Sequence, residues 1–384
     1  MLQFPHTPYN QPMHIGIDCR LPTYQMGGIS HYTIHLIQAL AALGREDDYT
    51  IFHSHREKRD FHPKDNRLFS RSDVWTPCHH RLERYTLGVE VIRHRLDVLH
   101  SPDFIPPAFG ANRRVITVHD LNFLYYPEFL TAESRRFYAD QIQWAVEAAD
   151  HIISDSDATR LDLINLLHVS PEKVTTIHLA ASPVYSASHS PEAIQATTRQ
   201  LGTGEGFILG VGTLEPRKNW PMLIEAYAAL RRDYHITVPL VLVGGKGWLY
   251  EDIFRTIASL GLESHVAHLS GVTDVQLAHL YSAAAVLAFP SHTEGFGLPA
   301  LEAMHAGCPV VASSRGSLPE VVGSAAILLE PTNLSSWIES LAMVLTSEDV
   351  ARSMTLAGFE QAKKFTWRKT ALATSDIYHR VMAQ

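Results

Sequence analysis

Two glutamates, Glu294 and Glu302, are eight residues apart. Glu294 lies in a loop that contains glycines, and Glu302 lies in the first turn of the helix expected to follow it. The apolar run 284–289 before them predicts a buried strand, and Gly295 and Gly297 predict a tight turn. Where a strand, a glycine-rich turn and a helix N-terminus meet, several backbone N–H groups converge and can bind an anion. A nearby carboxylate would repel a phosphate, so the glutamates are better suited to accept hydrogen bonds from sugar hydroxyls. The combination predicts a site for a phosphate flanked by sugars, as in a nucleotide sugar.

Two adjacent cations, Arg217 and Lys218, follow the apolar run 207–211 and precede a helix expected to begin near Trp220. Arginine offers a planar fork for phosphate oxygens, and lysine offers a mobile point charge. Cations are unfavourable at a helix N-terminus because the helix dipole is positive there, which favours a functional role over two solvated surface charges. A departing diphosphate gains negative charge, so fixed cations would stabilise the transition state more than the ground state.

The segment EGFGLPALEAMHAG, which contains Glu294 and Glu302, resembles the signature of the retaining glycosyltransferases of family 4, which have the GT-B fold. The segment GTLEPRKN, residues 212–219, is similar to the phosphate-binding segment of the same family. The order of the pieces also agrees, from a glycine pair near the start to a last helix that contains a tryptophan. The resemblance spans roughly residues 13–380, and its C-terminal motifs are specific, whereas the N-terminal half agrees mainly in layout.

The resemblance implies a role for each residue of these motifs. Glu302 would hold the ribose hydroxyls, Glu294 would contact the transferred sugar, and Arg217 and Lys218 would bind the diphosphate. Backbone groups of neighbouring residues would line the same nucleotide sugar: Gly212, Gly295, Phe296, Gly297 and Leu298. Many family members have an arginine where this chain has Thr213, which leaves the individual role of Arg217 open.

Two glycine-containing turns are open to a functional and to a structural interpretation. Gly271 and Val272 follow an expected strand and resemble the loop that receives the nucleobase, but they fit a plain strand-to-helix turn equally well. Gly27 and Gly28 would let the backbone come close to the diphosphate or the acceptor, or they simply begin a helix. The cluster 244–247, which contains three glycines, is a weak signal of the same kind.

His119 ends an expected strand in the first half of the chain. It resembles a histidine that lies near the donor sugar in this family, and it is therefore expected among the catalytic residues with Arg217, Lys218 and Glu294. A histidine at a strand end is more often structural, so the structural alternative stays open.

The resemblance implies that the anomeric configuration is retained. No two acids are placed as the nucleophile and acid that glycosidases need, which favours departure of the diphosphate while the acceptor attacks from the same face. No DxD-type ligand set lies near the motifs, so we expect no metal and no cofactor, with a nucleoside-diphosphate sugar as the donor substrate.

The GTLEPRKN variant is similar to bacterial mannosyltransferases, which makes GDP-mannose the first hypothesis for the donor. The expected acceptor is a saccharide or a lipid-linked saccharide in polysaccharide or glycoconjugate biosynthesis. Two alternatives remain open: a non-catalytic nucleotide-sugar-binding subunit, and another GT-B enzyme such as a nucleotide-sugar epimerase.

Short apolar runs alternate with helical patterns along the whole chain, which predicts parallel sheets covered by helices on both faces. We expect an α/β protein of the GT-B class, with two doubly wound Rossmann-like domains that face each other across a cleft. The expected boundaries are an extension at 1–12, an acceptor-binding domain at 13–183, a linker at 184–206, a nucleotide-sugar-binding domain at 207–366 and a helix at 367–384 that returns to the first domain.

Composition bounds the remaining properties. The chain has 384 residues, 46% of them hydrophobic and 19% charged, and its net charge of −8 argues against nucleic-acid binding. It has three cysteines, no long apolar run and no secretory signal, which predicts a cytoplasmic protein. Residues 53–95 are mildly basic, with aromatic and leucine residues interleaved. By resemblance to many members of the family, this region is expected to face anionic lipid at the inner face of a membrane, or a lipid-diphosphate acceptor. A solvated loop and helix is the alternative for this region.

Overall fold

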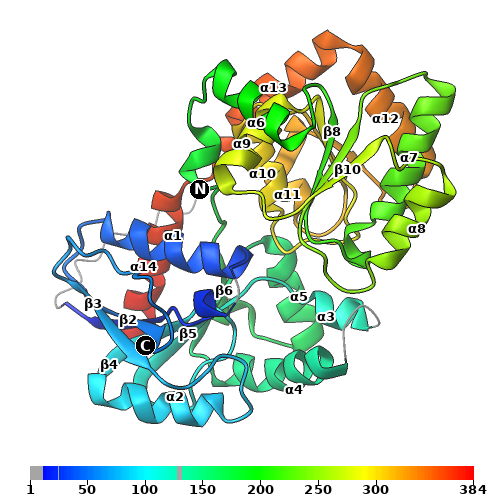
Figure 1. Ribbon diagram of the computed structural model, residues 1–384. Coiled ribbons are helices and arrows are strands. Elements are labelled where there is room, and N and C mark those ends of the chain that lie inside the picture. Colours follow the sequence, from blue (N-terminus) through cyan, green and yellow to red (C-terminus); the bar gives the residue numbers. More distant parts are fainter. Residues whose placement is uncertain (1–11, 25, 128–131) are drawn as a thin grey trace. The chain divides into compact units, whose positions relative to one another are not determined.

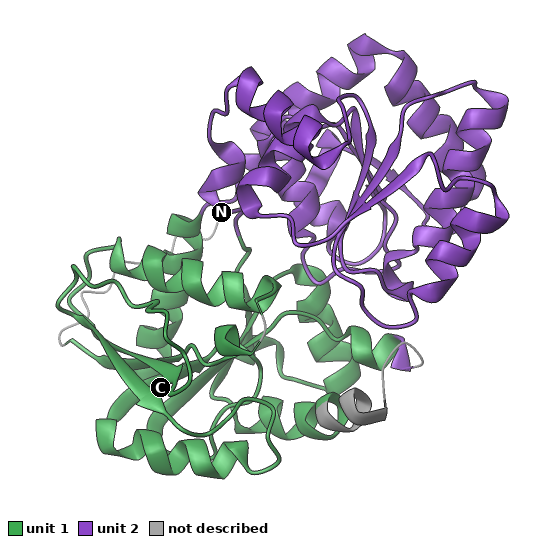
Figure 2. Cartoon of the chain, in the orientation of Figure 1, with its two compact units in different colours: residues 1–125, 130–179, 367–384 green, residues 126–129, 180–366 purple. Residues whose placement is uncertain are grey.

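The computed structural model describes residues 12–24, 26–127 and 132–384. The chain forms two compact units, which Figure 2 distinguishes by colour. The N-terminal unit consists of residues 1–125, 130–179 and 367–384, and the C-terminal unit of residues 126–129 and 180–366. The last helix of the chain therefore belongs to the N-terminal unit.

The N-terminal unit is built on a seven-stranded sheet in the order β3-β2-β1-β4-β5-β6-β7, and all of its paired strands are parallel. Apolar, largely β-branched segments form its centre, because a parallel sheet is buried on both faces. The strands are β1 (His14–Asp18), β2 (Asp48–Ser54), β3 (Phe69–Val74), β4 (Leu96–Ser101), β5 (Ala111–Val118), β6 (His151–Ser154) and β7 (Val174–Thr176).

Helices cover both faces of this sheet, with α1 and α14 on one face and α2 and α4 on the other (Figure 1). The helices of this unit are α1 (Gly28–Ala41), α2 (Glu83–Val91), α3 (Asn122–Tyr125), α4 (Ala132–Ala148), α5 (Asp157–Leu167) and α14 (Trp367–Ala383). Buried polar groups tie α14 to the sheet: the Tyr378 hydroxyl lies 2.7 Å from Nδ1 of His100 on β4, and Thr370 Oγ1 donates to the His178 carbonyl at 2.8 Å.

The C-terminal unit has a six-stranded parallel sheet in the order β10-β9-β8-β11-β12-β13. Its central strands are buried at every position, in agreement with the continuous apolar runs of the sequence. The strands are β8 (Ile208–Val211), β9 (Leu240–Val243), β10 (Val266–Leu269), β11 (Val286–Phe289), β12 (Val310–Ser313) and β13 (Ile327–Leu329).

Eight helices of the C-terminal unit are described. They are α6 (Pro191–Leu201), α7 (Trp220–Asp233), α8 (Glu251–Ser259), α9 (Asp274–Ala283), α10 (Leu298–His305), α11 (Leu318–Val322), α12 (Leu334–Thr346) and α13 (Glu348–Ala362). Trp220 and Trp337, both fully buried, anchor α7 and α12 in an apolar cluster of this unit. Two Rossmann-like parallel-sheet units confirm the expected α/β fold class.

Two details differ from the sequence-based expectations. The segment 184–206 was expected to be a linker, but it contains α6, which packs on α9 and belongs to the C-terminal unit. Thr197 on α6 and His279 on α9 join the two helices through a hydrogen bond of 2.7 Å. Strand β3 was not expected, because its sequence FSRSDV is polar at its exposed positions, as an edge strand allows.

Among the described residues, no helix combines the length and the hydrophobicity needed to cross a bilayer.

Candidate functional site

The cationic and acidic residues of the C-terminal unit meet because β8 and β11 are neighbours in its sheet. Arg217 and Lys218 lie in the short turn Pro216–Lys218 that follows β8, and Glu294 lies in the loop that follows β11. The carboxyl ends of parallel strands share one edge, where open α/β sheets bind ligands. The His292 amide donates to the Arg217 carbonyl at 2.9 Å and joins the two loops.

Three of the expected site residues are in direct contact. The Lys218 ammonium donates to Oε1 of Glu294 at 2.6 Å, and Nη1 of Arg217 donates to Oε2 of the same carboxylate at 3.0 Å. Arg217 also donates to the Thr293 carbonyl at 2.9 Å and to Glu215 at 2.7 Å. Glu294 therefore fixes the directions of both cations.

The electrostatics of this cluster keep Glu294 ionised. Burial alone would raise the pKa of the Glu294 carboxyl, but the charges of Lys218 and Arg217 lower it to about 2. Lys218, Glu294 and Glu215 are each less than a tenth exposed, so water screens their charges weakly. Two cations face two carboxylates, and the cluster is close to electrical balance.

The turn Gly244–Gly247, a weak signal in the sequence, packs against the segment 212–219. A Cβ on Gly244 would lie 2.0 Å from the Gly212 carbonyl oxygen, and one on Gly247 would lie 2.7 Å from the Thr213 methyl group. The Leu214 amide donates to the Gly245 carbonyl at 2.9 Å, and the Gly247 amide donates to the Leu214 carbonyl at 3.0 Å. The two loops approach each other so closely that only glycine fits at these positions.

Gly316 and Ser317, which the sequence analysis missed, hold the backbone of Glu294. Gly316 has φ = +60°, and a Cβ there would lie 2.7 Å from the Glu294 carbonyl oxygen. The amide and hydroxyl of Ser317 donate to that oxygen at 3.2 and 3.0 Å. The contact cannot be read from the sequence, because Gly316 and Ser317 are more than 20 residues from Glu294; the available signal is a glycine three residues after the end of β12.

Glu302 lies on α10 of the same unit and has a different partner. The hydroxyl of Tyr281, on α9, donates to Oε2 of Glu302 at 3.0 Å, and Tyr185 packs edge-on against the Tyr281 ring. Burial raises the pKa of the Glu302 carboxyl to about 7, although the Tyr281 hydrogen bond lowers it and Asp274 raises it further. Glu302 therefore titrates near neutral pH, whereas Glu294 does not.

The turn between Glu294 and α10 presents backbone rather than side chains. Gly297 is the residue before α10, with φ = +98°, and a Cβ there would lie 2.5 Å from the Leu318 side chain. The Phe296 side chain is buried against Phe365. The backbone of Phe296, rather than its side chain, is therefore available to contact a ligand. Gly295 and Leu298 are partly exposed beside it. Roles for these four residues in binding a nucleotide sugar stay predictions.

Gly271 and Val272 lie between β10 and α9, at the same edge of the sheet. A Cβ on Gly271 would meet nothing within 4 Å, so packing does not account for this glycine, although its φ of +69° does favour one. Thr273 caps α9 in a capping box with Gln276. Both interpretations of this turn, the nucleobase loop and a plain connection, stay open.

His119 lies in the N-terminal unit, just after β5, and both of its ring nitrogens are occupied. Nδ1 lies 2.5 Å from Oδ2 of Asp155, and Nε2 lies 2.8 Å from the Pro102 carbonyl. Burial alone would lower the pKa of His119, but the Asp155 carboxylate raises it to about 9. Because both partners are acceptors, His119 is an imidazolium that bridges Asp155 and the loop after β4.

Gly27 and Gly28 begin α1 of the N-terminal unit, and a Cβ on Gly28 would meet nothing within 4 Å. The helix N-terminus is therefore open to a close approach, which is what the functional interpretation needs.

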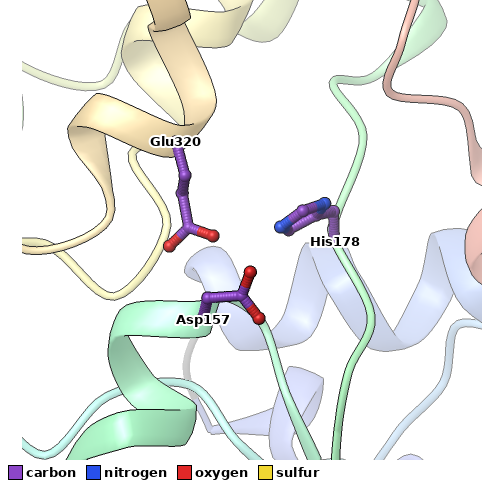
Figure 3. A group of neighbouring side chains, drawn as sticks. All are labelled: Asp157, His178 and Glu320. Atoms are coloured by element: carbon purple, nitrogen blue, oxygen red, sulfur yellow. The ribbon is translucent and has the colours of Figure 1, made fainter. Parts of the chain in front are cut away.

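A carboxylate oxygen of Asp157, on α5, and a ring nitrogen of His178, after β7, lie within 4.8 Å of each other in this unit (Figure 3). Glu320, also drawn there, stands on α11 of the C-terminal unit. Asp157 and His178 provide fewer ligands than a metal site needs, and we assign none.

Two family profiles match the chain, one on each half. The profile described as "Glycosyltransferase Family 4" matches residues 26–182, and the one described as "Glycosyl transferases group 1" matches residues 195–361. The second range contains Arg217, Lys218, Glu294 and Glu302.

Curated relatives include bacterial mannosyltransferases. The chain is 29% identical over 372 residues to the O-antigen chain mannosyltransferase B of Escherichia coli, and the match covers 92% of this chain and 96% of that one. It is 30% identical over 275 residues to the serotype-specific mannosyltransferase WbdA of Escherichia coli, and there the match covers 70% of this chain but only 34% of the relative.

Two solved structures illustrate the similarity of fold. WaaG, described as a glycosyltransferase involved in lipopolysaccharide biosynthesis, has a TM-score of 0.75 at 19% identity and covers 95% of this chain and 99% of its own. Anabaena Alr3699/HepE, solved with UDP and glucose, has a TM-score of 0.75 at 20% identity with the same coverage. At these identities the likeness shows the fold.

Proposed function

Because the chain belongs to the group 1 glycosyltransferases of family 4, we propose that it transfers a hexose from a nucleoside-diphosphate sugar to an acceptor hydroxyl. Mannose from GDP-mannose is the first candidate donor, since the relatives above are named mannosyltransferases. The acceptor is a saccharide or a lipid-linked saccharide in polysaccharide biosynthesis, as the names of the O-antigen and lipopolysaccharide enzymes suggest.

The observation that carries this proposal is the contact of Lys218 and Arg217 with Glu294 at the carboxyl edge of the C-terminal sheet. In the reaction, the bond from the anomeric carbon to the diphosphate oxygen breaks and leaves negative charge on the diphosphate. Lys218 and Arg217 stabilise this charge, and because they are already held in place they need little reorganisation. Glu294 accepts hydrogen bonds from the transferred sugar, and Glu302 accepts them from the ribose hydroxyls.

The configuration at the anomeric carbon is retained in this proposal. The acceptor oxygen attacks from the face that the diphosphate leaves, and the acceptor proton passes to a departing diphosphate oxygen. Two fixed cations supply the positive charge that a divalent metal supplies in other transferases. We therefore expect turnover to persist after dialysis against a chelator, with the re-addition of Mg²⁺ as the comparison.

A donor panel tests the function. The protein is mixed with GDP-, UDP-, ADP- and dTDP-sugars, and the shift of its unfolding temperature and the slow hydrolysis of each donor are measured, because a ligand that binds only the folded state raises that temperature. We expect the largest shift and the fastest hydrolysis with GDP-mannose. A shift without hydrolysis or transfer to any acceptor would support a non-catalytic binding subunit, and conversion to an epimeric sugar nucleotide would support an epimerase.

A further inference from the structure

Glu215 is a second buried carboxylate that contacts the cations of the C-terminal unit. It lies between β8 and the turn that carries Arg217 and Lys218, and it is 3% exposed. Its Oε1 accepts a hydrogen bond of 2.7 Å from Nη2 of Arg217, while Nη1 of the same guanidinium donates to Oε2 of Glu294 at 3.0 Å. One guanidinium therefore bridges two carboxylates. The proposed reaction uses Glu294 and leaves Glu215 without a task.

The loop after β9 packs beside Glu215. A Cβ on Gly247 would lie 3.5 Å from the Cβ of Glu215. Lys246, the cation of this loop, is engaged elsewhere, because its ammonium lies over the rings of Tyr250 and Phe254, at 4.8 and 5.2 Å from their centroids. Water reaches Glu215 poorly, so the charge of this carboxylate acts on its neighbours over several ångströms.

The backbone of the cation-bearing turn does not depend on the Glu215 side chain. The Lys218 amide donates to the Glu215 carbonyl at 3.2 Å. Asn219 ends the turn with φ = +57°, and its side-chain amide donates to the carbonyls of Pro290 and Pro331 at 3.3 and 2.8 Å. We therefore expect the turn to stay in place when the Glu215 side chain is replaced.

The charge of Glu215 opposes the binding of an anion next to Arg217. A carboxylate paired with a phosphate-binding cation weakens the binding of the phosphate, since like charges repel. This repulsion is larger for a nucleoside diphosphate than for its sugar ester, because breakage of the bond to the anomeric carbon leaves a terminal phosphate that gains a further negative charge near neutral pH. Glu215 therefore disfavours the product more than the donor.

We propose that Glu215 is a positioning residue with a second effect: it holds Arg217 in place beside Glu294, and its charge limits the affinity for the nucleoside diphosphate so that this product is released. The inference rests on the proposed glycosyl transfer and adds a step that follows the chemistry. The two carboxylates on the Arg217 guanidinium then have different tasks, since Glu294 contacts the transferred sugar and Glu215 acts on the departing diphosphate through its charge.

Binding and release of GDP by the full-length chain test this role. Glu215→Gln keeps the size of the side chain and an oxygen that accepts from Arg217, but it removes the charge. Its affinity for GDP, measured by calorimetry, should rise about tenfold. The release of GDP that carries a methylanthraniloyl fluorophore, followed during a chase with unlabelled GDP, should slow by a similar factor, because affinity differences between related complexes lie mostly in the dissociation rate. If the donor panel favours another base, that nucleoside diphosphate replaces GDP.

Hydrolysis of GDP-mannose separates the charge of Glu215 from its hydrogen bond. GDP should inhibit the hydrolysis by Glu215→Gln at about tenfold lower concentration than the hydrolysis by the wild type. Glu215→Ala removes the hydrogen bond to Arg217 as well as the charge, so it should hydrolyse the donor more slowly than Glu215→Gln. A residue that only stabilised the fold would change the unfolding temperature without tightening the binding of GDP.

Glu225→Gln is the matched control, because it removes the same charge from an exposed position on α7. Its affinity for GDP should equal that of the wild type, since water and salt screen an exposed charge. Binding of GDP by Glu215→Gln that is no tighter than by the wild type would overturn this inference and leave the proposed function intact. A wild type that binds none of the nucleoside diphosphates would overturn the proposed function, and this inference with it.

Discussion

The Lys218 ammonium and the Glu294 carboxylate form a buried ion pair of 2.6 Å between residues that are 76 positions apart in the chain. Arg217 holds the second oxygen of the same carboxylate. One acidic side chain thus orients both cations that we propose for the diphosphate. This arrangement predicts that substitutions within the cluster will separate nucleotide binding from turnover.

Replacement of Glu294 by glutamine is expected to abolish transfer but not binding. The neutral amide keeps the size of the side chain, releases Lys218 and Arg217 from their ion pairs and removes a negative charge next to the diphosphate. Affinity for a nucleoside diphosphate should stay equal or rise, whereas turnover should fall by about a hundredfold or more, as expected when a group that contacts the reacting sugar is lost. Titration calorimetry and initial rates measure the two quantities.

Lys218→Met is a control whose expected effect on nucleoside diphosphate affinity is opposite to that of Glu294→Gln. It removes a cation and leaves Glu294 without one of its partners, so both nucleoside diphosphate affinity and turnover should fall. A Glu294→Gln protein with unchanged turnover would contradict the role of this carboxylate in the reaction.

The binding of a nucleoside diphosphate is expected to depend on the ionisation of Glu302. Its carboxyl has a pKa raised by burial to about 7, and ribose hydroxyls donate best to the ionised form. Affinity should therefore rise between pH 6 and pH 8, with release of a proton on binding. Calorimetry in buffers of different ionisation enthalpy measures that release.

Two variants isolate this effect. Glu302→Gln should bind more weakly at high pH and retain only the pH dependence of the nucleotide's own phosphate. Tyr281→Phe removes a hydrogen bond that lowers the pKa of Glu302, so the midpoint of the pH dependence should move to higher pH. An unchanged midpoint in Tyr281→Phe would contradict this coupling.

Gly316→Ala is expected to disturb the position of Glu294. The left-handed φ of +60° costs a non-glycine residue about 1–2 kcal/mol. The new Cβ would also press on the backbone of Glu294, at 2.7 Å from its carbonyl oxygen. Gly261→Ala is the matched control, because its φ of +64° is nearly the same and a Cβ there would meet nothing within 4 Å.

Comparison of the two variants separates backbone strain from displacement of Glu294. Both should lower the unfolding temperature, and Gly316→Ala should in addition lower kcat, whereas Gly261→Ala should leave kcat unchanged. Equal kcat values in the two proteins would show that the Glu294 loop tolerates the shift.

The ion pair of His119 and Asp155 is expected to make the stability of the N-terminal unit depend on pH. Asp155 raises the pKa of His119 to about 9, above its unfolded value of about 6.5. The pair's contribution is therefore fully present below pH 6.5 and is lost as pH rises through 9, by about 3 kcal/mol. Urea unfolding of the wild type at pH 6 and pH 10 should show this loss of unfolding free energy. In Asp155→Asn, most of the difference between the two pH values should disappear.

Much of the fold followed from local patterns. Strands such as Leu240–Val243 and Val286–Phe289 are continuous apolar runs because a central parallel strand is buried on both faces. Strand Phe69–Val74 escaped prediction because an edge strand can expose polar residues. The helix Pro191–Leu201 lies in a stretch that was interpreted as the interdomain connection because it is rich in serine, threonine, glycine and proline, although a helix at 191–201 was considered. Its contact with Asp274–Ala283 assigns it to the C-terminal unit.

The sequence by itself determined the motifs of the C-terminal half that contain Arg217, Lys218, Glu294 and Glu302, and the residue types of these motifs predict recognition of phosphate and hydroxyl groups. Only the tertiary structure decided their partners. Glu294 is ionised between two cations, whereas Glu302 bonds to a tyrosine and titrates near neutrality. The reason is physical: a pKa and a preferred rotamer depend on burial and on neighbouring charges, and strand order brings those neighbours together from distant parts of the chain.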